Sequence, residues 1–217
     1  MSRYEVKFIT NQENYDSVML WIKSSILSFK KSYPDRIVNN IYFDDLNFEN
    51  FHDNVVGISK RRKVRYRWYQ NSNTILPGYL EIKSKQNNLG SKQLYKIDNV
   101  DFDINSSWEI FINFLKTKLT KNSNIYLENL RAVLFNSYHR KYFESQNKKI
   151  RITVDQKQKF YKQNSSLRPN FTRPNPSLDV ITIEIKAEQK YQELVSKLLN
   201  NIPFRQTKYS KYVVGCS

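Results

Sequence analysis

Charged and apolar residues alternate along several short segments of this chain, and this two-residue period is the feature that most limits its fold. In the segment 63–69, KVRYRWY, basic residues at every second position alternate with Val64, Tyr66 and Trp68. The same alternation recurs in residues 3–8, 79–85, 137–143, 150–155 and 181–186. Successive side chains of a strand point to opposite faces, so each segment is expected to be a strand with one apolar and one charged face.

Taken alone, each charged face could be the solvated side of a sheet that is packed by helices. As a set, however, these faces repeat Arg, Lys and Glu, and the opposite faces are strongly apolar and need cover. Helical periodicity is restricted to residues 11–25, 108–119 and 189–199, and loops are expected at 70–78 and 164–177. The pattern therefore predicts an α+β fold: an antiparallel β-barrel of about eight strands around a basic tunnel, with flanking helices.

The charge balance points to a polyanionic partner. Lys and Arg number 36 against 20 Asp and Glu, a formal net charge of +16, which favours nucleic acid, an anionic membrane or phosphate chains. The plainer alternative is a generally basic, soluble surface. A tunnel lined with cations cannot be dry, because an unpaired buried charge costs several kcal/mol. It must hold water and counter-anions, and phosphate-rich ligands would relieve its repulsion.

Length and cysteine content narrow the organisation of the chain. Its 217 residues fit one domain, predicted over 1–217. Cys216 is the only cysteine, which suits a reducing compartment. No apolar run approaches the ~20 residues of a membrane span, and the first residues lack a signal-peptide pattern. A cytoplasmic location is the resulting expectation.

Eight motifs occur along the chain in an order that resembles a known family. They are RYEVKF, NNIYFDD, KVRYRWY, LEIK, Tyr138–His139–Arg140, RITVD, ITIEIK and the terminal KYSKY. This order is similar to that of the VTC domain, the polyphosphate polymerase domain of the vacuolar transporter chaperone complex and its bacterial relatives. That domain belongs to the triphosphate tunnel metalloenzymes, a CYTH-like superfamily. The resemblance runs from Arg3 to Tyr212 and implies a basic tunnel that binds triphosphate or polyphosphate.

The resemblance also implies roles for individual residues. The catalytic phosphate-binding set is Lys7, Arg65, Arg67, Lys83, Arg140, Arg151, Lys208 and Lys211. Tyr138 and Ser210 add phosphate contacts, as do Lys92 and Lys96, between which the spacing after Lys83 does not decide. Glu184 takes the place of the metal-binding glutamate, and hard oxygen ligands suit Mg²⁺ or Mn²⁺.

Two departures from the wider superfamily bear on function. That superfamily begins with Glu-x-Glu-x-Lys, whereas this chain has Arg3, Glu5 and Lys7. VTC-type domains share the change, which favours a polymerase over a triphosphatase with several metal carboxylates. The family's further arginine before the Arg-x-Arg strand falls in the run 60–62, KRR, where the sequence does not decide between the three residues. The chain lacks the family's membrane part, so coupling to transport would need a separate membrane partner.

The resulting prediction is an ATP-dependent polyphosphate polymerase, a phosphotransferase that moves the γ-phosphate of ATP to a growing chain with Mn²⁺ or Mg²⁺. The acceptor oxygen is already ionised, so no general base is needed, and His139 is expected to be structural. One rival is a triphosphate or polyphosphate hydrolase, with Glu5 or Glu81 holding the water. Another is a non-catalytic polyphosphate-binding module. Nucleic acid is disfavoured because Tyr66 and Trp68 lie opposite the arginines of their strand.

Overall fold

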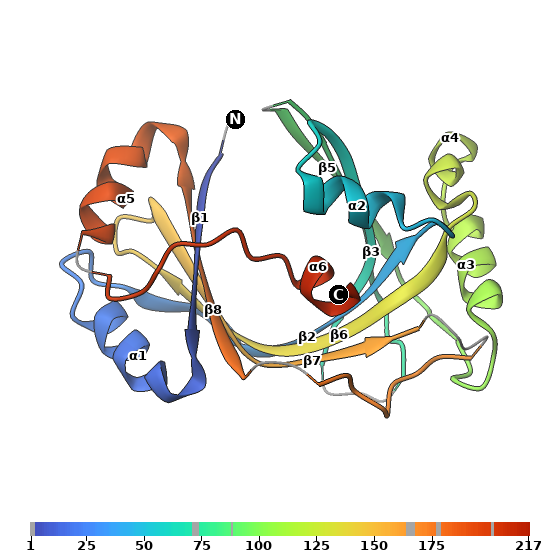
Figure 1. The fold of residues 1–217 in the computed structure, drawn as a ribbon, viewed down its shortest axis with the longest axis horizontal. Helices are drawn as coiled ribbons and strands as arrows, with labels where there is room; N and C mark the ends of the chain where they lie inside the picture. The colour runs from blue at the N-terminus through green and yellow to red at the C-terminus, as the bar shows by residue number, and fades with distance from the viewer. Residues whose placement is uncertain (1–2, 71–73, 88, 164–167, 177–178, 201) are drawn as a thin grey trace. The chain divides into compact units, whose positions relative to one another are not determined.

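The fold is built on eight strands, as the computed structural model shows for residues 3–70, 74–87, 89–163, 168–176, 179–200 and 202–217 (Figure 1). The strands are β1 (Arg3–Asn11), β2 (Lys30–Asp44), β3 (Lys60–Tyr69), β4 (Gly78–Gln86), β5 (Leu89–Ile97), β6 (Arg131–Glu144), β7 (Ile150–Lys162) and β8 (Val180–Glu188). The α-helices are α1 (Tyr15–Lys23), α2 (Glu49–Val56), α3 (Trp108–Thr117), α4 (Lys121–Asn124), α5 (Gln192–Leu199) and α6 (Lys211–Cys216). Three short 3₁₀ helices lie at Gln12–Asn14, Ile125–Leu127 and Gln189–Tyr191.

The strands form one antiparallel sheet in the order β1-β8-β7-β6-β2-β3-β4-β5. This confirms the α+β class, the number of strands and the flanking helices. The sheet is not closed, however, because β1 and β5 are its edges among the described strands. The expected barrel is therefore an open sheet by hydrogen bonding.

The Cα packing divides the chain into two compact units, each made of segments far apart in the sequence. Unit 1 comprises residues 1–37, 138–158 and 177–209, and unit 2 comprises residues 38–137, 159–176 and 210–217. Strands β2, β6 and β7 each contribute residues to both units. The single domain over 1–217 remains a prediction.

Unit 1 packs α1 and α5 on the apolar face of its strands (Figure 1). Ile181, Ile183 and Ile185 alternate along β8 and are fully buried. They contact Val18 and Ile22 of α1 in one cluster, which also includes residues of β1, β7 and α5. The charged positions of these strands are consequently on the other face of the sheet.

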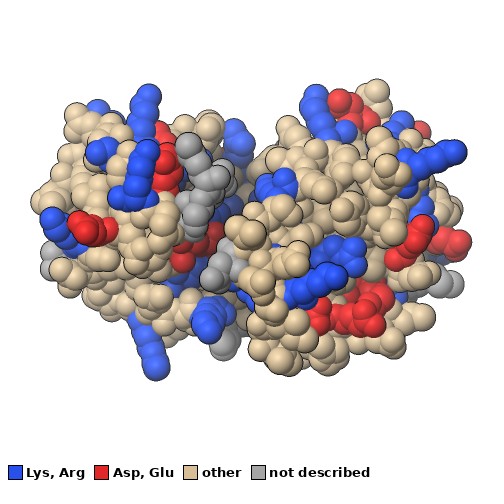
Figure 2. Space-filling model, turned by 90° about the horizontal axis from the view of Figure 1, so that it is seen from above, with Lys and Arg blue, Asp and Glu red and all other residues tan. Residues whose placement is uncertain are grey.

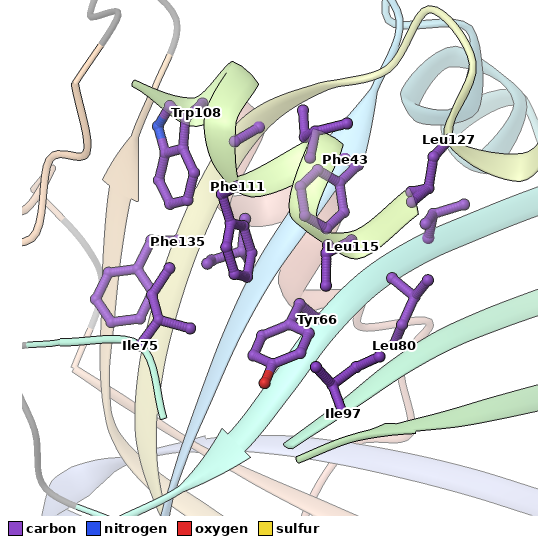
Figure 3. Packing of buried hydrophobic residues seen from close by; sticks show 14 of the residues in the cluster. Phe43, Tyr66, Ile75, Leu80, Ile97, Trp108, Phe111, Leu115, Leu127 and Phe135 are labelled. Carbon is purple, nitrogen blue, oxygen red and sulfur yellow. The ribbon is translucent and has the colours of Figure 1, made fainter. Parts of the chain in front are cut away.

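Unit 2 has a second core, which α3 covers (Figure 3). Tyr66 of β3 meets Phe111 of α3 edge-on, with ring centroids 5.3 Å apart, and Trp68 stacks on Phe135 of β6 at 5.8 Å. The buried Tyr66 hydroxyl donates to the Leu76 carbonyl at 2.7 Å, as a buried phenol requires. This packing fixes the faces of β3 and leaves Lys63, Arg65 and Arg67 on the side away from α3.

A buried carboxylate joins three elements of unit 2. Asp44, at the end of β2, accepts from the backbone N–H groups of Asn50 and Phe51 at 3.0 and 2.9 Å. It thereby satisfies two of the open N–H groups at the start of α2. The hydroxyl of Tyr212 in α6 donates to the same carboxylate, and its ring stacks on Tyr42 of β2 with centroids 5.0 Å apart. Asp44 therefore anchors both α2 and the C-terminal helix.

The helices expected at 11–25, 108–119 and 189–199 are present in shortened form as α1, α3 and α5. Residues 71–73, 164–167 and 177 of the two expected loops lie outside the described residues. The described part of the first loop has no helix or strand before Gly78, where β4 begins, and the described part of the second loop has none. Within the part of the chain that the structure describes, no helix has the length and apolar character needed to cross a bilayer.

Candidate phosphate-binding site

Four charged side chains of alternating sign gather on β1 and β8 in unit 1, and we call Glu5, Lys7, Glu184 and Lys186 the glutamate cluster. Cross-strand pairing of Lys7 with Glu184 and of Glu5 with Lys186 puts all four on one face. Lys7 Nζ lies 3.1 Å from Glu5 Oε1 and 3.8 Å from Glu184 Oε1. Lys186 Nζ lies 3.6 Å from Glu5 Oε2 and 3.2 Å from Glu184 Oε1. Each carboxylate oxygen of Glu5 thus pairs with one of the two lysines.

Glu184 is charged in spite of its burial. Only 12% of its side chain is exposed, and burial by itself raises the pKa of this carboxyl. Lys186, a hydrogen bond with Glu5, Lys7 and Arg140 act in the other direction, so the net pKa is well below its usual range. An ionised carboxylate is therefore available on this face at neutral pH.

The glutamate cluster fits a divalent cation that is held jointly with phosphate. Thr153 pairs with Glu184 across β7 and β8, and its buried Oγ1 has no hydrogen-bond partner among the described residues. A carboxylate and a hydroxyl are the hard oxygen ligands that Mg²⁺ and Mn²⁺ take, and Mg²⁺ commonly uses one or two carboxylates with substrate phosphates. The described residues contain no group of three or more His, Cys, Asp or Glu suited to a metal. Phosphate oxygens would therefore have to complete the coordination.

Arg140, at the β6 end of unit 1, is held by a buried carboxylate. Its Nε donates to Asp155 Oδ1 at 2.5 Å and its Nη2 to Oδ2 at 2.7 Å, a two-pronged pair. The guanidinium also lies 5.2 Å from the ring centroid of the buried Tyr138. Burial lowers the pKa of Arg140, but Asp155 and the other acidic groups nearby raise it by more than burial lowers it. The net pKa is therefore above the usual value. Arg140 is thus a fixed cation, with Tyr138 beneath it.

Arg151 and Lys208 are more exposed than Lys7 and Arg140, the other basic residues predicted for the site in unit 1. Arg151 pairs with Lys186 across β7 and β8, which places it on the face of the glutamate cluster. The segment before α6 runs beside β1, because Thr207 N donates to the Lys7 carbonyl at 2.9 Å. Lys208 follows directly and lines an open pocket of about 490 Å³ with Arg205. Both predicted residues therefore lie on or next to the strands of the cluster.

A second basic group lies in unit 2, and we call Arg65, Arg67, Glu81 and Lys92 the arginine cluster. Glu81 is its centre: Arg65 Nε donates to Oε2 at 2.8 Å, Lys92 Nζ lies 3.1 Å from Oε1 and Arg67 Nη1 lies 3.8 Å from Oε1. Burial raises the pKa of Glu81, but the three cations lower it by more than burial raises it, so the net pKa is well below the usual range. One carboxylate thus orders three cations and leaves the cluster positive.

Arg67 is the most buried cation of this cluster, with 9% of its side chain exposed against 15% for Arg65. Its Nε donates to Asn40 Oδ1 at 2.7 Å, and Asn40 Nδ2 donates to Asn136 Oδ1 at 2.8 Å. Asn136 Nδ2 is buried and has no acceptor among the described residues. These asparagines orient Arg67, and the sequence analysis did not identify them.

The structure separates the two candidates Lys92 and Lys96. Lys92 joins Glu81 in the arginine cluster. Lys96 is 64% exposed and forms an ion pair with Asp98 at 2.9 Å. Lys83 is exposed and lies directly opposite Lys92 in the pairing of β4 with β5. Lys92 therefore belongs to the arginine cluster, and phosphate binding by Lys92 or Lys96 remains a prediction.

Ser210 and Lys211 stand at the start of α6, where Tyr212 is anchored to Asp44. Ser210 Oγ accepts from Lys63 Nζ at 2.9 Å and from the backbone N–H of Val213 at 3.4 Å. Lys63 shares its face of β3 with Arg65 and Arg67. The anchor thus brings Ser210, at the start of α6, to the basic face of β3.

The basic run before β3 divides between the two faces of that strand. Arg62 lies over the Tyr126 ring, 5.7 Å from its centroid, on the α3 side. Arg61 shares the face of Arg65, but its Nη1 donates to the carbonyls of Gly57 and Ile58 at 3.3 and 2.8 Å. Lys60 is exposed. Of the three, only Arg61 is on the basic face, where it binds its own turn.

Basic residues are spread over the whole visible surface, with acidic residues interspersed (Figure 2). The net charge alone therefore does not locate a site, and the cross-strand clusters do. His139 is exposed, and its structural role remains a prediction.

Comparison with known proteins places the chain in a family. The family model of the VTC domain matches residues 2–217. No curated protein matches the sequence significantly. Solved structures of similar fold include PH1819 from Pyrococcus horikoshii OT3, with 13% identity, a TM-score of 0.51 and coverage of 98% of this chain and 96% of that one.

A proposed adenylate cyclase from Vibrio parahaemolyticus has 10% identity and a TM-score of 0.56, with 99% of this chain and 98% of that chain covered. A chain of the Schizosaccharomyces pombe Mediator head module has 8% identity and a TM-score of 0.53, with 95% and 98% covered. At such identities the likeness concerns the fold alone. The family model of the VTC domain, in contrast, matches nearly the full length, so the chain belongs to the VTC domain family. This family is a branch of the tunnel-fold proteins, which are in general enzymes that act on triphosphate or polyphosphate.

Proposed function

We propose that this chain is a metal-dependent polyphosphate polymerase, which transfers the γ-phosphate of ATP to a growing polyphosphate chain. The proposal rests chiefly on the glutamate cluster. An ionised, largely buried Glu184 lies within 4 Å of two ammonium groups. Its cross-strand partner Thr153 has a hydroxyl with no hydrogen-bond partner in the part of the chain that the structure describes. This arrangement combines a divalent-cation ligand with cations for phosphate oxygens.

The chemistry requires little beyond positioning and charge neutralisation. A terminal oxygen of the acceptor chain would attack the γ-phosphorus, and the bond from that phosphorus to the β–γ bridging oxygen would break, releasing ADP. The attacking oxygen is already ionised, so no side chain has to remove a proton. A Mg²⁺ or Mn²⁺ held by Glu184 and Thr153 would supply positive charge that offsets the charge of the phosphates.

The arginines would bind the non-bridging oxygens of the phosphates. Arg65 and Arg140 are each oriented by a buried carboxylate, Glu81 and Asp155 respectively. Guanidinium groups present a planar fork that suits phosphate oxygens, and a fork already held in place loses less entropy on binding. The other predicted basic residues would add positive charge within each unit: Lys7, Arg151 and Lys208 in unit 1, and Lys83, Lys92 and Lys211 in unit 2.

Incubation of the purified chain with ATP and Mn²⁺, followed by a gel for long phosphate polymers, tests the activity. The proposal expects polymers and ADP that disappear when the metal is chelated. Release of orthophosphate from tripolyphosphate without polymers would instead identify a hydrolase. Tight binding of polyphosphate without either product would identify a non-catalytic binding module. We propose a cytoplasmic location and a separate membrane partner for any transport.

A further inference from the structure

Three lysines from neighbouring strands form a row across unit 2, and we call Lys63, Lys83 and Lys92 the lysine row. Lys63 is the cross-strand partner of Lys83 in β3 and β4, and Lys83 is the partner of Lys92 in β4 and β5. Directly opposite residues share a face, with Cβ atoms about 4.5–5.5 Å apart. Three ammonium groups are therefore carried side by side on the basic face.

Repulsion between the three ammonium groups should destabilise the folded protein unless an anion offsets it. Like charges directly opposite one another in a sheet are destabilising. The carboxylate of Glu81 binds Lys92, but it also binds Arg65 and Arg67. The single negative charge of Glu81 thus faces a larger number of cations, and a polyanion would neutralise the excess.

Two members of the lysine row, Lys83 and Lys92, are also more accessible than the arginines of this face. Arg65 and Arg67 have 15% and 9% of their side chains exposed, whereas Lys92 has 37% and Lys83 is an exposed residue. The row follows the Arg65–Glu81 pair by two residues along the strands, about 6.7 Å toward the turn between β4 and β5. A chain of phosphates bound at Arg65 could extend along this face to the lysines.

The two levels of this face differ in chemistry. The arginines are held by Glu81 and by Asn40, so they offer fixed geometry. Lysine ammonium groups are point charges on flexible stems with rotatable donors. They suit oxygens that change position as a chain lengthens. Lys63 Nζ also donates to Ser210 Oγ at 2.9 Å, which links the row to a predicted phosphate contact.

We propose that the lysine row is a second phosphate-binding position, with Lys63 as a member that the predicted site does not contain, and that it selects linear polyphosphate over triphosphate. The inference rests on the proposed function, since it assumes that phosphate chains bind this face. It adds the substrate class: chains long enough to occupy the arginine cluster and the lysine row together.

Calorimetric titration of the Lys63→Met variant with tripolyphosphate and with long-chain polyphosphate tests the inference. The affinity for the long chain should fall about tenfold, the loss of one charge-assisted contact, while the affinity for tripolyphosphate stays within about twofold. Lys63→Arg, which keeps the charge, should retain most of the preference for the long chain. Lys121→Met removes an exposed charge from α4 of the same unit and should leave both affinities unchanged.

An equal loss for both ligands in Lys63→Met would overturn the inference, because Lys63 would then act on triphosphate as well. No change for either ligand would overturn it too. If the parent and the other two variants bind the long chain more tightly than tripolyphosphate and Lys63→Met does not, the lysine row is supported. This conclusion holds whether or not the protein synthesises polymers. If the parent protein binds neither ligand, the proposed function itself fails.

Discussion

Arg65 directs two N–H groups, from Nε and Nη2, at the same oxygen of Glu81, at 2.8 and 2.5 Å. Its Nη1 is turned toward the Tyr42 hydroxyl at 3.3 Å. The guanidinium is therefore held from two sides by residues of neighbouring strands. Glu81, the glutamate of the LEIK segment, thus orients Arg65. This role does not require Glu81 to contact phosphate.

Substitution of Glu81 by Gln should remove a pH-dependent part of the stability. Burial raises the pKa of Glu81 in the folded protein, but Arg65, Arg67 and Lys92 lower it far below the unfolded value of about 4.3. Its contribution is complete above the unfolded pKa and is lost as the pH falls through the folded pKa. Between pH 7 and pH 3 the parent should therefore lose on the order of 1–2 kcal/mol relative to Glu81→Gln. Urea unfolding at both pH values measures this, and a constant difference would contradict the assignment.

The buried pair of Arg140 and Asp155 should be costly to break. Asp155→Asn leaves the largely buried guanidinium without its charged partner, and removal of one partner of a buried pair costs about 3 kcal/mol or more. Asp35→Asn is the matched control, because it removes the exposed pair with Lys141, the next residue along β6. That change should cost at most about 1 kcal/mol. Equal unfolding midpoints for the two variants would refute the structural role of Asp155.

Glu184→Ala should abolish the effect of metal on phosphate binding while retaining binding itself. In the proposed mechanism Glu184 binds the metal, whereas Lys7 and Lys186 bind phosphate. Titration with tripolyphosphate in the presence and absence of Mn²⁺ should show metal enhancement in the parent and none in the variant. Glu5→Gln is the control, since each Glu5 oxygen pairs with a lysine, and it should keep the enhancement. Persistence of the enhancement in Glu184→Ala would exclude Glu184 as the ligand.

The hydroxyl of Tyr212 should contribute measurably to stability. Burial and the hydrogen bond to Asp44 raise the pKa of Tyr212, so the phenol is protonated and donates to the carboxylate. Tyr212→Phe leaves Asp44 one donor short, and we expect a loss of about 2 kcal/mol. Tyr33→Phe, at an exposed position, should change stability by less than about 0.5 kcal/mol. Similar melting curves for the two variants would show that α6 is not anchored through this contact.

The sequence predicted the strands well because their alternation has a direct physical cause. In β3 and β8 one face must pack against helices, so the period of two appears in the letters. Closure of the sheet could not be predicted this way, since hydrogen bonding between two distant edge strands leaves no local pattern. Helix α6 was also missed: it is six residues long and is held by Asp44, which lies 168 residues before Tyr212.

The basic residues of the predicted site were identified by their motifs, but their partners were not. Asp155 and Asn40 look like ordinary polar strand residues. Only the pairing of β7 with β6 and of β2 with β3 reveals that they orient Arg140 and Arg67. Lys63 was visible as a member of the basic face of β3. The alternation within one strand could not show that it stands opposite Lys83, because that requires the pairing with β4.

The central claim is that phosphate chains are the ligand of the basic faces, and ligand ranking tests it most directly. Calorimetry with monophosphate, tripolyphosphate, long-chain polyphosphate and an oligonucleotide, at two salt concentrations, supplies the ranking. We predict affinity that rises at least tenfold from monophosphate to tripolyphosphate, as one net charge-assisted contact of about 1.4 kcal/mol requires. Affinity should rise again with the long chain and weaken with salt. Equal affinity for monophosphate and tripolyphosphate, or tighter binding of the oligonucleotide than of polyphosphate, would contradict the account.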